Sequence, residues 1–299
     1  MQDTEKKEVT KNDGTVQTDQ KQYEKRKWDA ILDPGWTEKY AKLPSGIRMC
    51  YCEMGPEDGD AVLLVHGAGD CRISWSRVAP VLAEGGKRVI VAELRGHGKT
   101  DLPRPKRGYY LIDDYTEDLA ALLDAIGVKA VHYAGHSCGS LAGQLLAARY
   151  PEKVRTLTLI ATGPTVELFQ DVRIPEDAEP FDDAYCRDWA ACTILDPAFK
   201  EATYQYVRQL SMDAWRWIQN GIRAFDSSGE LGRITCPVQI IWGSEDAVFS
   251  AKDQEKMQQL LIHAPVTFIP MAGSSHSPHW DSWESMFAVA QELLAFAEK

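Results

Sequence analysis

Short apolar runs alternate with amphipathic segments along most of this chain of 299 residues. A continuous apolar run is typical of a strand buried on both faces of a parallel sheet, whereas apolar positions three and four residues apart are typical of a helix. Strand-like runs occur at residues 61–65, 88–92, 130–134, 156–160, 238–242 and 266–269. Helix-like segments occur at residues 113–126, 140–150 and 282–297. The alternation predicts an α/β protein with a mostly parallel central sheet flanked by helices.

This alternation breaks down after about residue 163, where the chain becomes acidic, then helical and aromatic, without a strand-like run. We expect residues 164–231 to form a helical cap above the carboxyl edge of the sheet, where open α/β folds bind ligands. Most of its aromatic residues should pack the cap's own core, and some should line an apolar pocket. These residues are Tyr185, Trp189, Phe199, Tyr204, Tyr206, Trp215, Trp217 and Phe225. The core would then consist of residues 28–163 and 232–299, preceded by a flexible polar tail at residues 1–27.

Composition narrows the class of partner. The formal net charge of −11 and the pI near 5.2 argue against nucleic acids and anionic membranes. No apolar run is long enough to span a membrane, and residues 1–27 lack the apolar segment of a secretory signal. The seven cysteines form no Cys-x-x-Cys pair and no metal-ligand spacing with histidines, which favours a reducing, cytoplasmic location. The sequence therefore predicts no cofactor, no metal ion and a small-molecule substrate.

A G-x-S-x-G motif at residues 135–139 lies between a strand-like run and a helix-like run. A serine on a sharp strand-to-helix turn needs small neighbours, because the backbone is strained and the flanking elements crowd it. The turn exposes the hydroxyl above the sheet, and the helix N-terminus behind it favours negative charge. The motif therefore predicts that Ser137 is a nucleophile.

A serine hydroxyl needs a base within hydrogen-bond reach, and a carboxylate has to orient that base. Asp246 follows the strand-like run at 238–242 and is the preferred acid, whereas Glu167, soon after the run at 156–160, is the alternative. His276 follows the run at 266–269 and is the preferred base, whereas His279 is better interpreted as a structural or pocket-rim histidine. Ser250, rather than Asp246, is expected to cap the helix that follows.

Stabilisation of a tetrahedral oxyanion requires backbone N–H donors that point at the developing charge. One donor should be Cys138, the residue after the nucleophile, and the second should come from the glycine-rich turn after Val65. Within that turn, Ala68 is the expected donor. Cys138 is interpreted as a small neighbour that offers its N–H group, and its thiol is not expected to act as the nucleophile.

Five motifs in this order resemble the α/β-hydrolase superfamily, in the branch that has a serine nucleophile and a helical cap. They lie at residues 64–69, 93–100, 135–139, 242–246 and 272–276, and the resemblance covers about residues 43–299. The resemblance disfavours an epoxide hydrolase or a haloalkane dehalogenase, since the nucleophile of those members is aspartate. This chain departs from the usual pattern of the family at two places. Glu93 stands where aspartate is common, and Ser274 and Ser275 separate Gly273 from His276, whereas glycine usually precedes the histidine directly.

Together, the residues and the resemblance predict a cofactor-free serine hydrolase that cleaves a medium-sized apolar ester or lactone through an acyl-enzyme. A carbon–carbon bond hydrolase and a thioesterase remain alternatives that use the same residues. A ligand receptor on a hydrolase scaffold is the alternative from a different functional class.

Overall fold

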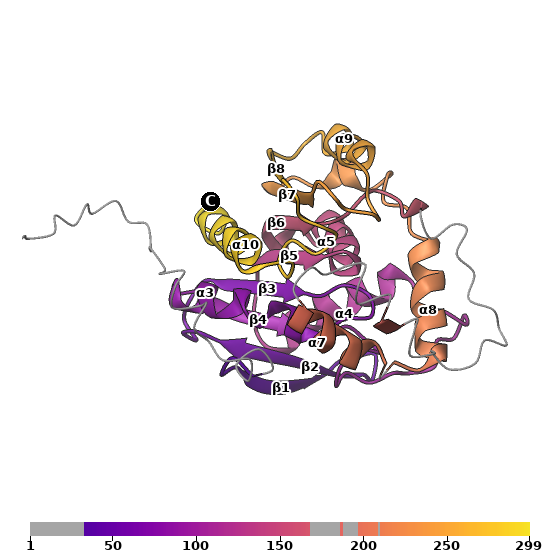
Figure 1. Cartoon of the computed structure of the whole chain (residues 1–299). Coiled ribbons are helices and arrows are strands. Elements are labelled where there is room, and N and C mark those ends of the chain that lie inside the picture. Colours follow the sequence, from indigo (N-terminus) through magenta and orange to yellow (C-terminus); the bar gives the residue numbers. More distant parts are fainter. Residues whose placement is uncertain (1–32, 168–185, 188–196, 209) are drawn as a thin grey trace, which may run out of the picture.

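One mostly parallel sheet forms the centre of the protein (Figure 1). The computed structural model describes residues 33–167, 186–187, 197–208 and 210–299, so the predicted tail at residues 1–27 lies outside the described residues. The eight strands of the described part are β1 Thr37–Lys42, β2 Arg48–Met54, β3 Ala61–Val65, β4 Arg88–Ala92, β5 Val131–His136, β6 Val154–Ile160, β7 Val238–Gly243 and β8 Val266–Met271. Their order in the sheet is β1-β2-β4-β3-β5-β6-β7-β8.

The strands β4, β3, β5, β6, β7 and β8, which are neighbours in this order, are parallel to one another. The strands β1 and β2 form an antiparallel hairpin, and β2 pairs antiparallel with β4. The predicted runs at residues 61–65 and 88–92 coincide with β3 and β4. The order and the direction of these strands confirm the predicted fold class. In such a sheet the carboxyl ends of the parallel strands lie at one edge, and the loops that leave them meet there.

Helices cover both faces of the sheet (Figure 1). The helices of the described part are α3 Val78–Glu84, α4 Ile112–Ala125, α5 Cys138–Arg149, α7 Pro197–Val207, α8 Met212–Arg223, α9 Ala251–Leu260 and α10 Trp283–Phe296, with the 3-10 turns η1 Arg72–Trp75, η2 Pro151–Lys153 and η4 Leu231–Arg233. Alternate residues of β3 point to opposite faces: Leu63 packs in the core beneath α4 and α5, and Leu64 packs in the core beneath α3 and α10. Both faces of the strand are therefore apolar, which explains its unbroken apolar sequence.

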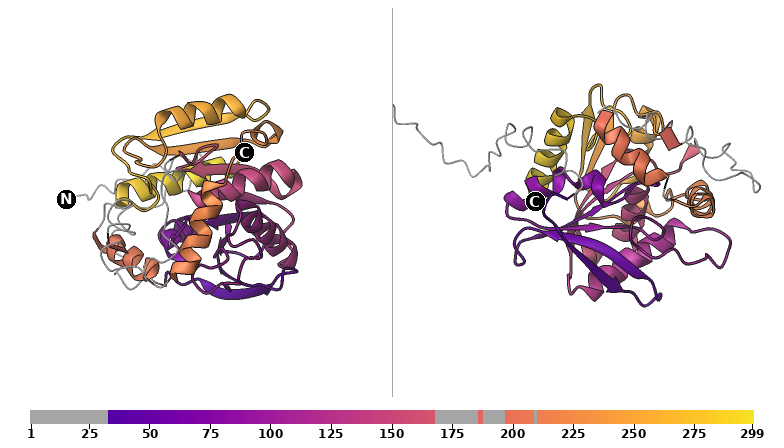
Figure 2. Two further views of the ribbon diagram at one scale, coloured as in Figure 1. Left: turned by 90° about the vertical axis from the view of Figure 1, so that its right-hand side faces the viewer. Right: turned by 60° about the horizontal axis from the view of Figure 1, so that its bottom comes forward.

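The described part of residues 164–231, hereafter the insertion, consists of helices and one isolated β-bridge between Thr165 and Asp226. Figure 2 shows α7 and α8 as two separate helices outside the layers that flank the sheet. Ser211 caps α8 by accepting a hydrogen bond from the Ala214 N–H at 3.1 Å. Tyr185 and Trp189, and the side chains of Phe199 and Tyr206, lie outside the described residues.

Three contacts place the insertion against loops that leave the carboxyl ends of the strands. The carbonyl of Trp217 in α8 accepts from the Tyr110 N–H at 3.2 Å. The Thr203 hydroxyl in α7 is 3.3 Å from the indole N–H of Trp280. Ala68, just after β3, packs against a buried cluster of the insertion that consists of Cys186, Tyr204, Val207 and Trp215. In the described part of the chain, no helix is long and apolar enough to cross a membrane.

Candidate active site

Ser137 lies at the sharp turn between β5 and α5. Its backbone angles are φ 48° and ψ −114°, a conformation that side-chain-bearing residues rarely adopt, and its N–H donates to the carbonyl of Ile160 at 2.9 Å. A Cβ atom on Gly139 would lie 2.7 Å from the carbonyl oxygen of His66, and one on Gly135 would lie 2.6 Å from the Ser140 nitrogen. The two glycines of the motif therefore allow the turn to fit between β3 and the start of α5.

His276 and Asp246 are hydrogen-bonded to each other at the same edge of the sheet. The distance from His276 Nδ1 to Asp246 Oδ1 is 2.9 Å, and both side chains are buried. Asp246 Oδ1 also accepts from the backbone N–H groups of Val248 at 2.8 Å and Phe249 at 3.2 Å. These donors fix the orientation of the carboxylate, whose oxygen accepts a hydrogen bond from His276 Nδ1–H, so Nε2 is the nitrogen that can act as a base.

The two serines before His276 are both held by hydrogen bonds to residues that follow His276 in the chain. The Ser275 N–H donates to Asp281 Oδ2 at 2.6 Å, and the Ser275 hydroxyl donates to the other oxygen of the same carboxylate. The hydroxyls of Ser274 and Ser285 are 2.9 Å apart, which joins the loop to α10. The departure from the family spacing thus produces an anchored loop that positions His276.

The two alternative residues lie elsewhere. Glu167 is exposed, and among the described residues it makes no hydrogen bond with His276. His279 is 1% exposed, and its ring packs against the rings of Trp75 and His136, with both centroid distances at 4.5 Å. The structure therefore brings Asp246, and not Glu167, to His276, and among the described residues His279 makes no hydrogen bond with either carboxylate.

His136 is a residue of this site that the sequence reasoning missed. Its Nε2 donates to the backbone carbonyl of His276 at 3.0 Å, so the neighbour of the nucleophile holds the loop of the base. Its ring centroid is 5.0 Å from that of His276. Burial, and then the neighbouring histidines, lower the pKa of His136 well below its usual value. The signal in the sequence was its position beside Ser137, inside a turn that the strand and the helix bury on both sides.

The turn after β3 lies directly beside the elbow. A Cβ atom on Gly67 would lie 2.8 Å from His136 Nδ1 and 3.3 Å from the Cβ of Ser137. Ala68 is half-buried, and Cys138 is the first residue of α5, where backbone N–H groups have no partner within the helix. Burial raises the pKa of the Cys138 thiol to about 12, so it stays protonated and is a poor nucleophile.

Two buried histidines support this turn from below. His66 donates from Nδ1 to the carbonyl of Gly67 at 2.7 Å and accepts at Nε2 from the Leu94 N–H at 3.1 Å. His97 donates from Nδ1 to the carbonyl of Arg95 at 3.1 Å and accepts at Nε2 from the Gly69 N–H at 3.2 Å. Burial lowers the pKa of both rings, that of His97 to about 4, so both are neutral.

Glu93, the departure from the usual aspartate, is fully buried beside these histidines. Its Oε1 is 2.6 Å from the guanidinium of Arg72, and its Oε2 accepts from the Lys99 N–H at 2.8 Å. Gly98 adopts a φ of 52°, and a Cβ atom there would overlap the Glu93 carboxylate. The loop at residues 93–100 is therefore a structural support for the turn.

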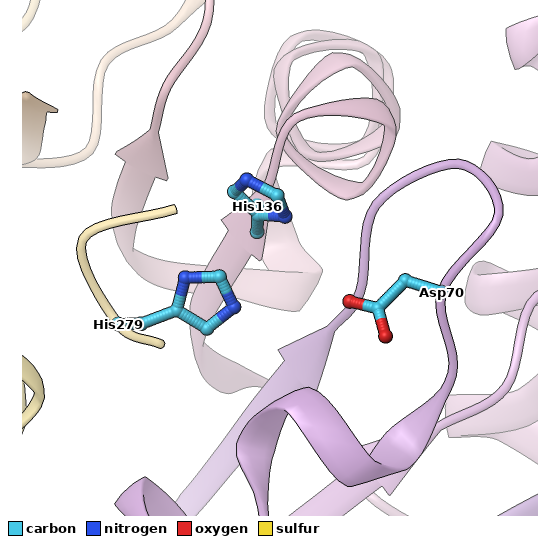
Figure 3. A group of neighbouring side chains, drawn as sticks. All are labelled: Asp70, His136 and His279. Atoms are coloured by element: carbon cyan, nitrogen blue, oxygen red, sulfur yellow. The ribbon is translucent and has the colours of Figure 1, made fainter. Parts of the chain in front are cut away.

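Asp70, His136 and His279 form a further polar group next to the elbow (Figure 3). One potential metal-ligating atom from each residue lies within 4.8 Å of the other two. Burial, and then the electrostatic interaction with His276, lower the pKa of His279 to about 3. Burial raises the pKa of Asp70 to about 7, in spite of hydrogen bonds from the Ser74 side chain and the Cys71 N–H.

Comparison with known proteins agrees with this architecture. Residues 60–190 match the family model of the alpha/beta hydrolase fold. The chain is 28% identical over 243 residues to a protein named as the carbamate hydrolase RutD of Variovorax paradoxus, covering 75% of this chain and 88% of that protein. Two similar structures have a TM-score of 0.77. They are a bacterial membrane phospholipase A, 26% identical with 91% and 89% of the two chains covered, and the enol-lactonase of Burkholderia xenovorans, 19% identical with 87% and 100% covered.

The sheet order, the elbow and the family match together define the class. The chain has the alpha/beta hydrolase fold, and it is similar to hydrolases that share this fold.

Proposed function

We propose that this hydrolase uses Ser137 as its nucleophile and cleaves a carboxylic ester or a lactone through an acyl-enzyme. The observation that carries this proposal is the 2.9 Å hydrogen bond between His276 Nδ1 and Asp246 Oδ1, next to a serine held at a φ of 48°. A buried, oriented imidazole near a partly exposed serine on a strand-to-helix turn is the arrangement that activates a hydroxyl. His136 joins the two halves, since it adjoins Ser137 and donates to the carbonyl of His276.

Each step of the reaction has a group in this arrangement. Ser137 Oγ attacks the carbonyl carbon and its proton passes to His276 Nε2, while Asp246 stabilises the imidazolium that forms. The N–H groups of Cys138 and Ala68 stabilise the oxyanion of the tetrahedral intermediate. His276 then protonates the leaving alcohol, and a water molecule, deprotonated by the same ring, releases the acid. No step requires a cofactor.

The insertion supports an apolar, medium-sized substrate. Its buried cluster of Tyr204, Val207, Trp215 and Cys186 packs against Ala68, the expected oxyanion donor. Apolar side chains therefore come close to the position where the acyl carbonyl would bind, and ligand sites are lined mostly by such side chains. We assign to residues 164–231 the role of a cap that covers this edge of the sheet.

A fluorophosphonate probe tests the nucleophile. Such a probe reacts with activated serines, so we expect one label per chain, located at Ser137 by peptide mass spectrometry. Ser137→Ala should lose the label, and Cys138→Ala should keep it, because the Cys138 thiol is protonated at neutral pH. Folded wild-type protein that remains unlabelled would contradict the serine mechanism.

A substrate screen tests the bond that is cleaved. We expect kcat/KM to rise with acyl length across p-nitrophenyl esters before it reaches a plateau, and we expect turnover of at least one small lactone. Ser137→Ala serves as the blank for every substrate. Labelling of Ser137 without turnover of any ester or lactone would keep the nucleophile and reject the substrate class.

A further inference from the structure

Three polar side chains outside the proposed catalytic steps converge beside the elbow. Asp70 comes from the loop after β3, His136 from the end of β5, and His279 from the loop between β8 and α10. In Figure 3 the carboxylate of Asp70 points toward the space beside the two imidazole rings. Segments that are far apart in the sequence thus bring one carboxylate and two imidazoles to one place.

The imidazole nitrogens at this place lack the partners that buried polar atoms normally have. His136 Nε2 donates to the carbonyl of His276, so His136 Nδ1 carries a lone pair, and this atom has no hydrogen-bond partner among the described residues. Both ring nitrogens of His279, which is 1% exposed, also have no hydrogen-bond partner among the described residues. A buried polar atom without a partner costs about 1–3 kcal/mol. Three such atoms in one place indicate that something binds there.

We propose that Asp70, His136 and His279 bind one divalent transition-metal ion of the zinc class. Neutral imidazoles and a carboxylate are the ligands that Zn²⁺ and its neighbours prefer, whereas Mg²⁺ and Ca²⁺ prefer oxygen ligands alone. Ligands of a tetrahedral zinc lie about 3.4 Å apart, as follows from bonds of about 2.0–2.1 Å. The three ligating atoms, now within 4.8 Å of one another, therefore need to approach by an ångström or so.

The structure leaves space next to two of the three proposed ligands, Asp70 and His136. Asp70 lines a cavity of about 160 Å³ between the loop after β4 and the start of α8, where Gly96, Gly98 and Ser211 also lie. Gly67 leaves free the space next to His136 Nδ1, which a Cβ atom would approach to 2.8 Å. The rings of Trp75 and His136 both pack against the His279 ring, which restricts its orientation, while its two nitrogens have no hydrogen-bond partner among the described residues. The cavity side would provide the fourth, open coordination position.

Metal binding to the whole chain tests this site without reference to its activity. Untagged protein, stripped with a chelator and kept reduced, is titrated with ZnCl₂ by calorimetry, and bound zinc is counted by mass spectrometry after dialysis. We expect one Zn²⁺ per chain and a higher melting temperature with zinc. His279→Phe keeps an aromatic ring packed against Trp75 and His136 but removes the ligand, and Asp70→Asn removes the charge. Each should weaken binding by at least tenfold, since even outer-shell changes cost 10–100-fold.

Matched proteins separate this site from other zinc-binding groups. His263 is exposed and remote, so His263→Gln should bind zinc as the wild type does. Ser137→Ala should also bind zinc normally, so the result is independent of the serine mechanism. The proposal is overturned if the wild type binds no stoichiometric zinc, in which case the space holds water. It is equally overturned if folded His279→Phe and Asp70→Asn bind zinc as tightly as the wild type, or if equimolar Mg²⁺ displaces the zinc.

Discussion

Two groups of buried histidines lie near the turn after β3 and differ in how completely their nitrogens are paired. Below the turn, each ring nitrogen of His66 and His97 has a backbone partner. At the elbow, His136 and His279 have nitrogens without hydrogen-bond partners among the described residues. Complete pairing stabilises one backbone conformation, whereas incomplete pairing leaves atoms available to a ligand or a substrate. Changes below the turn should therefore cost stability, and changes at the elbow should cost function.

The largest effect should come from Asp246→Asn. The amide would favour the wrong tautomer of His276, so kcat should fall by about 10⁴-fold while KM changes little. The free energy of unfolding should change far less than this loss of transition-state stabilisation, which corresponds to about 5.5 kcal/mol. Steady-state kinetics on an ester found in the substrate screen and urea unfolding measure the two effects.

Glu167→Gln is the matched control, because it makes the same change in an exposed carboxylate. It should keep its kcat within about twofold. If Glu167→Gln loses activity on the 10⁴ scale while Asp246→Asn stays active, the assignment of the triad acid is wrong, and the insertion supplies the carboxylate.

Glu93→Gln, in the loop that supports the turn after β3, should lower stability and leave catalysis nearly unchanged, which is the reverse of the effect expected for Asp246→Asn. The change leaves the buried guanidinium of Arg72 without its 2.6 Å partner, and breaking a buried pair costs about 3–5 kcal/mol. We expect the free energy of unfolding to fall by about 3 kcal/mol, with kcat per folded molecule nearly unchanged. Urea unfolding, combined with active-site titration by the fluorophosphonate probe, measures both quantities.

Glu38→Gln provides the comparison, since Glu38 is 3.2 Å from the same guanidinium but at the surface. Exposed ion pairs contribute about 0–1 kcal/mol, so this variant should be close to the wild type. Equal losses in the two variants would show that burial of Glu93 does not determine its contribution.

The central sheet could be predicted from the sequence because its strands are apolar on both faces. The hairpin of β1 and β2 could not, since five of the six residues of β1 are exposed and its sequence, Thr37-Glu38-Lys39-Tyr40-Ala41-Lys42, is mostly polar. Its place in the sheet depends on pairing with β2, and β2 in turn pairs with β4, which lies about forty residues further along the chain. Such pairing leaves no periodic signal within the strand itself.

For the candidate site, chain order was sufficient to predict that Asp246 and His276 lie together, as their hydrogen bond shows, because each follows a recognisable strand. The roles of His136 and Ser275 could not be predicted in the same way. The hydrogen bond from His136 to the carbonyl of His276 joins residues 140 positions apart, and the anchor of Ser275 on Asp281 depends on the path of one loop. Both arise from tertiary packing, which the pattern of apolar residues does not encode.

The pH dependence of stability should reveal the histidines below the turn. The pKa of His97 is lowered to about 4, whereas an unfolded histidine titrates near 6.5. Between these values the unfolded chain binds a proton that the folded protein does not, so stability falls as the pH falls from about 6.5 to about 4. His97 should account for about 1.4 kcal/mol per pH unit, or about 3 kcal/mol in total.

Urea unfolding of the wild type and His97→Gln from pH 4 to pH 8 measures this contribution. The variant should be less stable at pH 7, yet its stability should depend less steeply on pH between 4 and 6.5, by about one proton. The other buried histidines also have lowered pKa values and therefore change stability in the same direction as His97. The difference between the two curves isolates the contribution of His97. Parallel curves would indicate that His97 is already protonated in the folded protein.

The smallest effect should come from Ser275→Ala, which tests whether the loop anchor acts on the catalytic base. The change removes the hydroxyl bond to Asp281 but keeps the 2.6 Å bond from the backbone N–H, so His276 should shift only slightly. A small displacement of a catalytic group lowers kcat more than it changes KM, and we expect a loss of about tenfold. Ser250→Ala is the control: Ser250 caps α9, far from His276 in the chain, so this variant should lose about 1 kcal/mol of stability and keep its kcat. If the two variants have the same kcat, the Ser275 hydroxyl stabilises the loop without positioning the base, and the division between stability below the turn and function at the elbow would not extend to this loop.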